Sequence, residues 1–248
     1  MAKIKLLAIC MLSALSLNEA LAESKLTLGA GVGVVEHPYK NYDAQAYLFP
    51  AVSYDGDYFW FRGLGGGYYL WNDAADTLSV TAYWQPLYFK PGDSDHRQLR
   101  LLDKRKSTMM AGLSWSHHTQ YGFLRTTLAG DVLDNSNGIV WDAAWLYRYV
   151  NGGFTLTPGV GIEWNSQKQN EYYYGISHKE SARSGLQRYK PNDSWAPYLE
   201  ISANYRFAGD WSIYGAARYT RLSDEVSDSP MVDKSWSGLF STGISYRF

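Results

Sequence analysis

The sequence predicts an all-β protein, a transmembrane antiparallel β-barrel that follows a cleavable N-terminal signal. Three observations favour this fold class. Long segments alternate between apolar and polar residues, the apolar faces begin and end in aromatic residues, and the chain opens like a secreted precursor. Aromatic residues make up 16% of the chain, with 21 Tyr and 10 Trp, and a membrane barrel uses such rings at its two membrane–water interfaces.

The N-terminal segment has the three parts of a secretory signal peptide. Lys3 and Lys5 supply positive charge, residues 6–17 form an uncharged run of 12, and residues 20–22 (ALA) fit a small-x-small cleavage site. The run is too short for a membrane-spanning helix, which needs about 20 residues. We therefore expect residues 1–22 to be a signal peptide and residues 23–248 to form the barrel domain.

Composition excludes several other classes. The only cysteine, Cys10, lies in the predicted signal, so the mature chain cannot be a small domain held by disulfides. Removing Lys3, Lys5 and Glu19 with the signal leaves 21 basic against 23 acidic residues. This balance offers no basic field for nucleic acid.

Alternation with a period of two is the main signal for strands. In residues 195–207 the odd positions include Trp195, Leu199 and Phe207, whereas the even positions include Glu200 and Arg206. Successive side chains of a strand point to opposite faces, so one face is apolar with aromatic ends and the other is polar. A soluble β-sandwich also alternates. Charges in mid-strand and aromatic ends favour the membrane barrel instead.

The strand runs also have the length of membrane strands. The clearest alternating runs contain 9 to 13 residues, whereas soluble strands average about 5–6 and membrane strands about 9–11. A sheet in lipid must close on itself, because an open edge would leave unpaired backbone groups in hydrocarbon. The final run closes on Phe248, which resembles the terminal signal read by the barrel-assembly machinery of Gram-negative bacteria. We therefore expect the outer membrane as the location.

Eleven runs are visible, and this number conflicts with the even strand count of single-chain bacterial barrels. They lie near 25–36, 43–54, 57–71, 77–89, 106–118, 120–131, 139–150, 154–165, 195–207, 211–221 and 236–248. We predict twelve strands, with ten as the alternative, and residues 171–177 as the candidate for the missing strand. Residues 65–67, three glycines, are expected to kink a strand or to allow close packing. The odd count leaves open which loops face the periplasm.

The long connections are the expected place for function. They span roughly 90–105, 166–194 and 222–235. Tyr and Arg are enriched at binding hot spots, and residues 170–190 contain both. We therefore predict partner-binding residues Tyr173, Arg183 and Arg188. The alternative is that these loops only face solvent or lipopolysaccharide.

We find no catalytic or metal-binding pattern. The five histidines lack metal-ligand spacing, and the adjacent His117 and His118 point to opposite faces of a strand. Residues 134–138 (DNSNG) are similar to the His-x-Ser-Asn-Gly stretch of outer-membrane phospholipase A. Asp134 stands there in place of the histidine and is a poor base for Ser136. We interpret this stretch as a polar turn, and we expect no cofactor.

The predicted lumen carries charge of both signs. Strand parity places six arginines inside, namely Arg62, Arg125, Arg148, Arg206, Arg218 and Arg247, with the acids Asp142, Glu163 and Glu200. This is an excess of three positive charges. We favour a barrel largely filled by ion-paired side chains. A narrow pore with anion preference is the alternative.

Several segments together resemble the MipA/OmpV family of outer-membrane proteins. They are residues 28–40 (LGAGVGVVEHPYK), 59–71 (FWFRGLGGGYYLW), 170–175 (NEYYYG), 180–186 (ESARSGL) and 228–232 (DSPMV). The resemblance runs from the signal segment to Phe248. It implies a non-catalytic scaffold that links a membrane-bound murein lytic transglycosylase to a bifunctional penicillin-binding protein. It carries over no catalytic residues.

Three classes of function therefore stand after the sequence. A scaffold is ranked first and should capture murein enzymes without turnover. A small diffusion pore is second and should conduct ions. A lipase or protease is third and should depend on Ser136. A fold does not fix a function, so the scaffold role rests on the resemblance alone. The expected surroundings are outer-membrane lipid and lipopolysaccharide.

Overall fold

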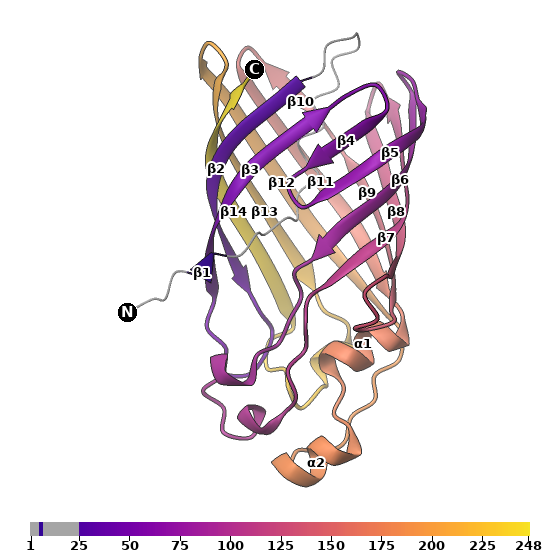
Figure 1. Ribbon diagram of the computed structural model, residues 1–248, viewed down its shortest axis with the longest axis vertical. Helices are drawn as coiled ribbons and strands as arrows, with labels where there is room; N and C mark the ends of the chain where they lie inside the picture. Colours follow the sequence, from indigo (N-terminus) through magenta and orange to yellow (C-terminus); the bar gives the residue numbers. More distant parts are fainter. Residues whose placement is uncertain (1–4, 7–24) are drawn as a thin grey trace.

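The structure is a computed structural model that describes residues 5–6 and 25–248, and it shows a closed antiparallel barrel (Figure 1). Its sheet contains fourteen strands. One of them, β1 (Lys5–Leu6), lies outside the wall and pairs with β3, and β10 continues the line of β9 along β11. Twelve strands therefore make the wall, as predicted. Apart from β1, the predicted signal peptide lies outside the described residues.

The wall strands follow each other in sequence order, and each pairs with its neighbours in the chain. They are β2 (Lys25–Glu36), β3 (Gln45–Asp55), β4 (Phe59–Arg62), β5 (Gly65–Asn72), β6 (Asp76–Gln85), β7 (Thr108–Thr119), β8 (Gly122–Asp131), β9 (Ile139–Leu146) with β10 (Tyr149–Asn151), β11 (Phe154–Asn165), β12 (Ser194–Ala208), β13 (Trp211–Arg221) and β14 (Trp236–Arg247). The barrel closes where β14 pairs with β2. Within the described part of the chain no helix is long and apolar enough to cross a membrane.

The missing strand lies within the predicted run 57–71, which is a hairpin and not one strand. The chain turns at Gly63, whose φ of 61° is a left-handed conformation that suits glycine. The three glycines at 65–67 allow close packing, because a Cβ at Gly67 would lie 2.6 Å from the Trp60 indole nitrogen. The candidate at 171–177 was wrong. Most of that segment belongs to helix α1 (Gln167–Tyr174).

The outer face of the wall is apolar. Large side chains such as Leu113, Val160 and Leu199 are about half exposed on this face. In the membrane such side chains contact lipid. Aromatic residues gather near both ends of the strands. Trp141 lies edge-on to Trp195 at one end, and Trp211 lies against Tyr246 at the other. These two groups are the girdles predicted from the sequence.

The two ends of the barrel differ. At one end the strands are joined by tight turns at 56–58, 73–75, 120–121, 152–153 and 209–210, and Lys25 and Phe248 lie there too (Figure 1). We call this end the turn surface. At the other end lie the long connections 37–44, 86–107, 132–138, 166–193 and 222–235. Outer-membrane barrels have short periplasmic turns and longer extracellular loops, so the turn surface faces the periplasm.

Candidate functional site

The long connections do not hang separately in solvent but fold together into one cap. We use this name for the connections 37–44, 86–107, 132–138, 166–193 and 222–235. Besides α1, the cap contains α2 (His178–Ser184), α3 (Asp224–Ser227) and two short 3-10 turns, Pro91–Asp93 and Leu99–Leu101. Its hydrophobic core joins side chains from four of the connections and includes Tyr39, Phe89, Ile176 and Met231, each nearly or fully buried. The cap is therefore a folded layer across the loop end of the barrel.

Aromatic rings around His37 hold the first connection in this core. The imidazole packs edge-on to Tyr42 and Tyr88, with ring centroids 5.2 and 5.1 Å away, and stacks on Tyr39 at 6.1 Å. Burial lowers the pKa of His37 to about 4, and the nearby Lys234 ammonium adds to this shift while Asp93 opposes it. His37 is therefore neutral at physiological pH.

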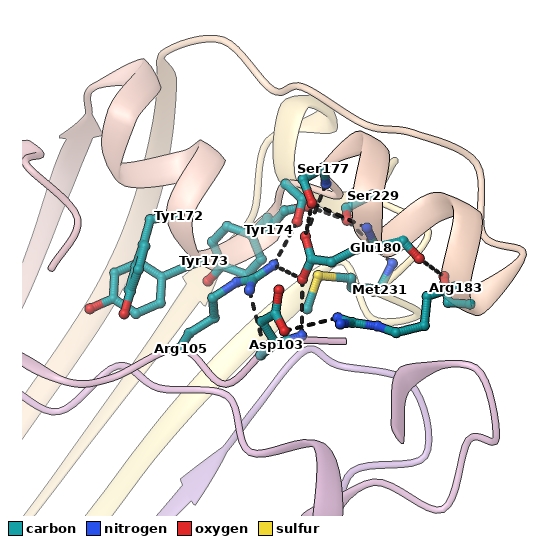
Figure 2. Close-up of polar contacts among 12 residues, drawn as sticks. Asp103, Arg105, Tyr172, Tyr173, Tyr174, Ser177, Glu180, Arg183, Ser229 and Met231 are labelled. Atoms are coloured by element: carbon teal, nitrogen blue, oxygen red, sulfur yellow. Dashed lines mark hydrogen bonds and ion pairs between the residues drawn. The ribbon is translucent and has the colours of Figure 1, made fainter. Parts of the chain in front are cut away.

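A buried ion pair joins two connections of the cap. Figure 2 shows the Arg105 and Glu180 side chains pointing toward each other, and the guanidinium lies 2.7 Å from the carboxylate. Arg105 also donates to the carbonyls of Gly175 and Asp103. The guanidinium and the carboxylate are almost wholly shielded from solvent, so each needs the other.

Glu180 also organises the start of α2. The Ser177 hydroxyl accepts from the Glu180 amide, while the Glu180 carboxylate accepts from the Ser177 amide and hydroxyl, which is a complete capping box. The carboxylate also accepts from the Asp103 amide at 3.0 Å. Burial alone would raise the pKa of Glu180. The hydrogen bonds from Ser177 and Asp103 and the charge of Arg105 together lower it below its ordinary value.

The three predicted partner-binding residues all lie in the cap but in different environments. Tyr173 is fully buried on α1, and its hydroxyl donates to the Lys106 carbonyl at 3.0 Å. Arg183 is exposed on α2 and pairs with Asp103 at 2.9 Å. Arg188 is exposed in the connection after α2. Tyr173 therefore has no surface to offer a partner, whereas Arg183 and Arg188 do.

Five of the nine charged residues predicted inside the barrel form an ion-pair network on one side of the lumen. Arg125 lies 3.1 Å from Glu200 and 3.7 Å from Asp142, and Arg218 lies 3.3 Å from Asp142 and 3.1 Å from Glu163. These residues come from the consecutive wall strands β8, β9, β11, β12 and β13. The network ties that side of the wall together.

Two further details complete the lumen. The Arg218 guanidinium lies over the Tyr198 ring, 3.5 Å from its centroid. The predicted excess of three positive charges omitted Asp55, which forms an ion pair with Arg62.

The lumen is not filled completely. A cavity of about 330 Å³ lies between the ion-pair network and the opposite wall of β3 and β6.

The segment around Ser136 is a polar turn, as predicted. The Asp131 carboxylate accepts hydrogen bonds from the Ser136 hydroxyl at 3.1 Å and from the backbone amides of 133, 135, 136 and 137. His117 bonds Asp76, whereas His118 lines the lumen cavity, so the two histidines do point to opposite faces. Among residues 5–6 and 25–248, no cluster of three or more His, Cys, Asp or Glu is placed to hold a metal ion.

Fold and site together define an outer-membrane β-barrel with a folded cap and an ion-paired lumen. The family model described as MltA-interacting protein MipA matches residues 28–248. The chain is 73% identical over all 248 residues to the MltA-interacting protein of Escherichia coli K12, with full coverage of both chains. The chain therefore belongs to the MipA family.

More distant relatives agree with the location. The chain is 40% identical over 237 residues to the putative outer membrane protein YiaT of Escherichia coli O157:H7, which covers 96% of each chain. It is 25% identical over 184 residues to the outer membrane protein OmpV of Vibrio cholerae, covering 74% of this chain and 71% of OmpV. Relatives named as outer-membrane proteins and the barrel fold place this chain in the outer membrane.

Proposed function

We propose that this protein is a non-catalytic scaffold that links a membrane-bound murein lytic transglycosylase, MltA, to a bifunctional penicillin-binding protein. The observation that carries this proposal is the 73% identity, over the full length, to a protein named for its interaction with MltA. At this identity the two proteins share their fold. The charged residues that form ion pairs in the cap and in the lumen stabilise the barrel. This structural role agrees with a non-catalytic protein.

The turn surface is the face we assign to the murein enzymes. Murein lies on the periplasmic side of the outer membrane, and the turn surface faces that side. Tyr58 and Tyr121 stand in two of its turns and are 68% and 71% exposed. Exposed tyrosines are frequent anchors of protein interfaces. The cap, with Arg183 and Arg188, lies at the opposite end, so partner binding there would need a partner on the cell surface.

A scaffold of this kind works by effective concentration. Two enzymes held on one partner meet at a local concentration on the order of mM when the links are short. The barrel needs only an exposed surface that both enzymes can occupy at once. Its fixed position in the membrane would keep a murein-cutting and a murein-building enzyme within reach of the same murein strand.

Affinity capture with purified barrel as bait tests the proposal. The bait is added to detergent-solubilised envelopes, and captured transglycosylase and penicillin-binding protein are quantified. We expect capture by the unchanged protein and a loss of roughly tenfold or more with Tyr58→Ala plus Tyr121→Ala, since interface anchors contribute about 2 kcal/mol each. Failure of the unchanged protein to capture either enzyme would sink the scaffold role.

A matched variant in the cap separates the two faces. Arg183→Ala plus Arg188→Ala changes two exposed residues of the cap without touching its core. We expect this variant to capture both enzymes as well as the unchanged protein does. If it loses capture and the tyrosine variant keeps it, the partner site lies in residues 170–190, as the sequence suggested, and the assignment to the turn surface is wrong.

A diffusion pore is the second candidate, and the lumen cavity is the observation that favours it. The cavity is lined by Arg62, Arg125 and Arg148 among other residues. Conduction would need a path through the cap. Planar-bilayer recording tests this candidate: stable single-channel currents that prefer anions would support it, and a silent bilayer would leave only the scaffold.

A further inference from the structure

The barrel wall is incomplete on the cap side of the β4–β5 hairpin. β3 pairs with β2 along its whole length, but on its other edge it pairs with β4 only at Ser53, Tyr54 and Asp55. The hairpin tip touches both neighbours, because the Gly63 amide donates to the Val52 carbonyl and the Trp84 amide donates to the Leu64 carbonyl. Beyond this tip no wall strand of the described chain lies between β3 and the segment that continues β6 to Tyr88, and the Tyr47 and Tyr88 hydroxyls hydrogen-bond across this interval at its cap end. We call this interval the seam.

The seam is as wide as the two hairpin strands that fill the neighbouring part of the wall. Where the hairpin is present, β3 and β6 are three strand spacings apart, or roughly 14 Å. The free edge of β3 runs from Gln45 to Ala51. Among the described residues only β1 pairs with this edge, at Tyr47 and Leu48. β1 belongs to the predicted signal peptide, so cleavage after Ala22 would leave the edge open in the mature protein.

The lumen cavity reaches the seam from inside. Five consecutive residues of β3, 49–53, line the cavity, and so do residues 83–86 on the opposite side of the seam. The cavity therefore borders both flanks of the seam on their lumen side.

The chemistry of the seam fits one kind of ligand. Its flanks carry apolar and aromatic side chains, among them Phe49, Pro50, Trp60 and Trp84, and the edge of β3 adds backbone donors and acceptors that pair with no strand of the described chain other than β1. The outward neighbour Leu48 is 43% exposed on the lipid-facing side. A cavity of about 330 Å³ is within the range of pockets that hold small ligands. We propose that the seam is a lateral opening through which the hydrocarbon chain of a membrane amphiphile enters the lumen cavity.

In this arrangement the hydrocarbon chain of the amphiphile packs against the aromatic residues of the seam. The ester, amide or hydroxyl groups of the amphiphile form hydrogen bonds with the backbone of the β3 edge. An added β-strand fits less well. The edge of β6 is already bonded to β5 and to Leu64, so an inserted strand would pair with β3 alone and leave its own second edge unpaired in hydrocarbon. An amphiphile has no such edge to satisfy.

Photolabelling from the bilayer tests this proposal. The processed barrel is reconstituted in phosphatidylethanolamine and phosphatidylglycerol vesicles that contain a phosphatidylcholine with a diazirine at the end of one acyl chain. After irradiation, labelled residues are mapped by peptide mass spectrometry. We expect label on the lumen-facing Phe49 and Tyr83 as well as on the outward Leu48. Label confined to outward residues such as Leu48 and Val80 would overturn the proposal.

Two substitutions on β3 provide a matched comparison. Ala51 lines the cavity, so Ala51→Trp should fill the entrance, whereas Ala46 has the outward orientation on the same strand. We expect Ala51→Trp to reduce label on Tyr83 by about fivefold, equivalent to about 1 kcal/mol of binding, with Leu48 unaffected. Ala46→Trp should leave the label on Tyr83 as it was. Equal labelling of Tyr83 in both variants would contradict entry through the seam.

A third substitution covers failure of Ala51→Trp to fold, which a heat-modifiability gel reveals. Phe49→Ala removes an aromatic side chain against which the hydrocarbon chain packs and should lower the label on Tyr83. An increase or no change would count against the proposal. Disulfide formation between two copies of a processed Leu48→Cys variant, whose only other cysteine, Cys10, is removed with the predicted signal, would show that a second copy of the chain covers the seam, and this result too would overturn the proposal.

Discussion

The Arg105 guanidinium and the Glu180 carboxylate lie 2.7 Å apart, and only 9% and 3% of the two side chains are exposed. The two residues are 75 positions apart in the sequence and belong to different connections of the cap. Breaking this pair leaves one buried charge without a partner. The cap therefore depends on this contact far more than on its surface ion pairs.

The first prediction compares this pair with an exposed one on the same helix. Arg105→Ala should destabilise the cap by about 3–5 kcal/mol, because Glu180 remains buried and charged. Arg183→Ala removes the exposed partner of Asp103 and should cost about 0–1 kcal/mol. Hydrogen exchange of cap amides, with the barrel strands as internal reference, measures both. Equal protection of the two variants would show that the buried pair has no special role.

The second prediction concerns pH. In the folded protein the pKa of His37 is lowered to about 4 from an ordinary value of 6.5. The unfolded cap therefore binds a proton that the folded cap does not. The cap is therefore most stable above pH 6.5, where His37 is neutral in both the folded and the unfolded state, and it loses stability as pH falls toward 4. We expect a loss on the order of 2 kcal/mol of cap stability between pH 7 and pH 5.

Limited proteolysis of the cap at the two pH values measures this loss. The variant His37→Phe keeps an aromatic ring among Tyr39, Tyr42 and Tyr88 but cannot take up a proton. It should remove most of the difference between pH 7 and pH 5. Glu180, whose pKa is also lowered, accounts for any loss that remains at lower pH. An unchanged pH dependence in the variant would exclude His37 as the cause.

The third prediction concerns the β4–β5 hairpin. A Cβ at Gly67 would lie 2.6 Å from the Trp60 indole nitrogen and 2.7 Å from the Val80 carbonyl oxygen. We expect Gly67→Ala to destabilise the barrel by about 1–3 kcal/mol, seen as a lower urea midpoint. Gly215→Ala is the control, because the nearest atom there is 3.7 Å away. A larger effect at Gly215 than at Gly67 would contradict this packing.

The fourth prediction concerns the lumen network. Arg125→Met leaves Glu200 and Asp142 with one cation fewer and should lower the free energy of unfolding by about 3 kcal/mol. Replacing both partners, Arg125→Met with Glu200→Met, should cost less than the sum of the single changes, because the stranded charge is gone. A double-mutant cycle in urea measures the coupling. Strict additivity would mean that the two side chains do not interact.

The wall of the barrel was predictable because its signal is local. An alternating pattern needs only neighbouring residues, so strands such as β12 and β13 were located to within one or two residues. The hairpin at Gly63 was missed because aromatic residues continue on both sides of the turn and hide the break. The total of twelve still held, since it rested on the even number that closed bacterial barrels require.

The cap was less predictable, although part of its signal was present. Ser177 and Glu180 have the spacing of a capping box, and Gly185 stands where a helix ends, so α2 could have been found. The tyrosines 172–174 suggested a strand by their propensity. In the structure the buried residues of α1, namely Gln169, Asn170, Tyr173 and Tyr174, recur at helical spacing. Packing inside the cap outweighed propensity.

The sequence by itself determined the membrane wall: its strands apart from the β4–β5 hairpin, its lipid-facing side and its girdles, because these depend on residues next to each other in the chain. Only the tertiary structure decided that the loops form one cap, that Arg105 meets Glu180, that Asp55 neutralises Arg62, and that a seam separates β3 from β6. These features join residues far apart in sequence. Their partners are selected when the barrel closes, by distance and burial, and no repeating pattern along the chain encodes that selection.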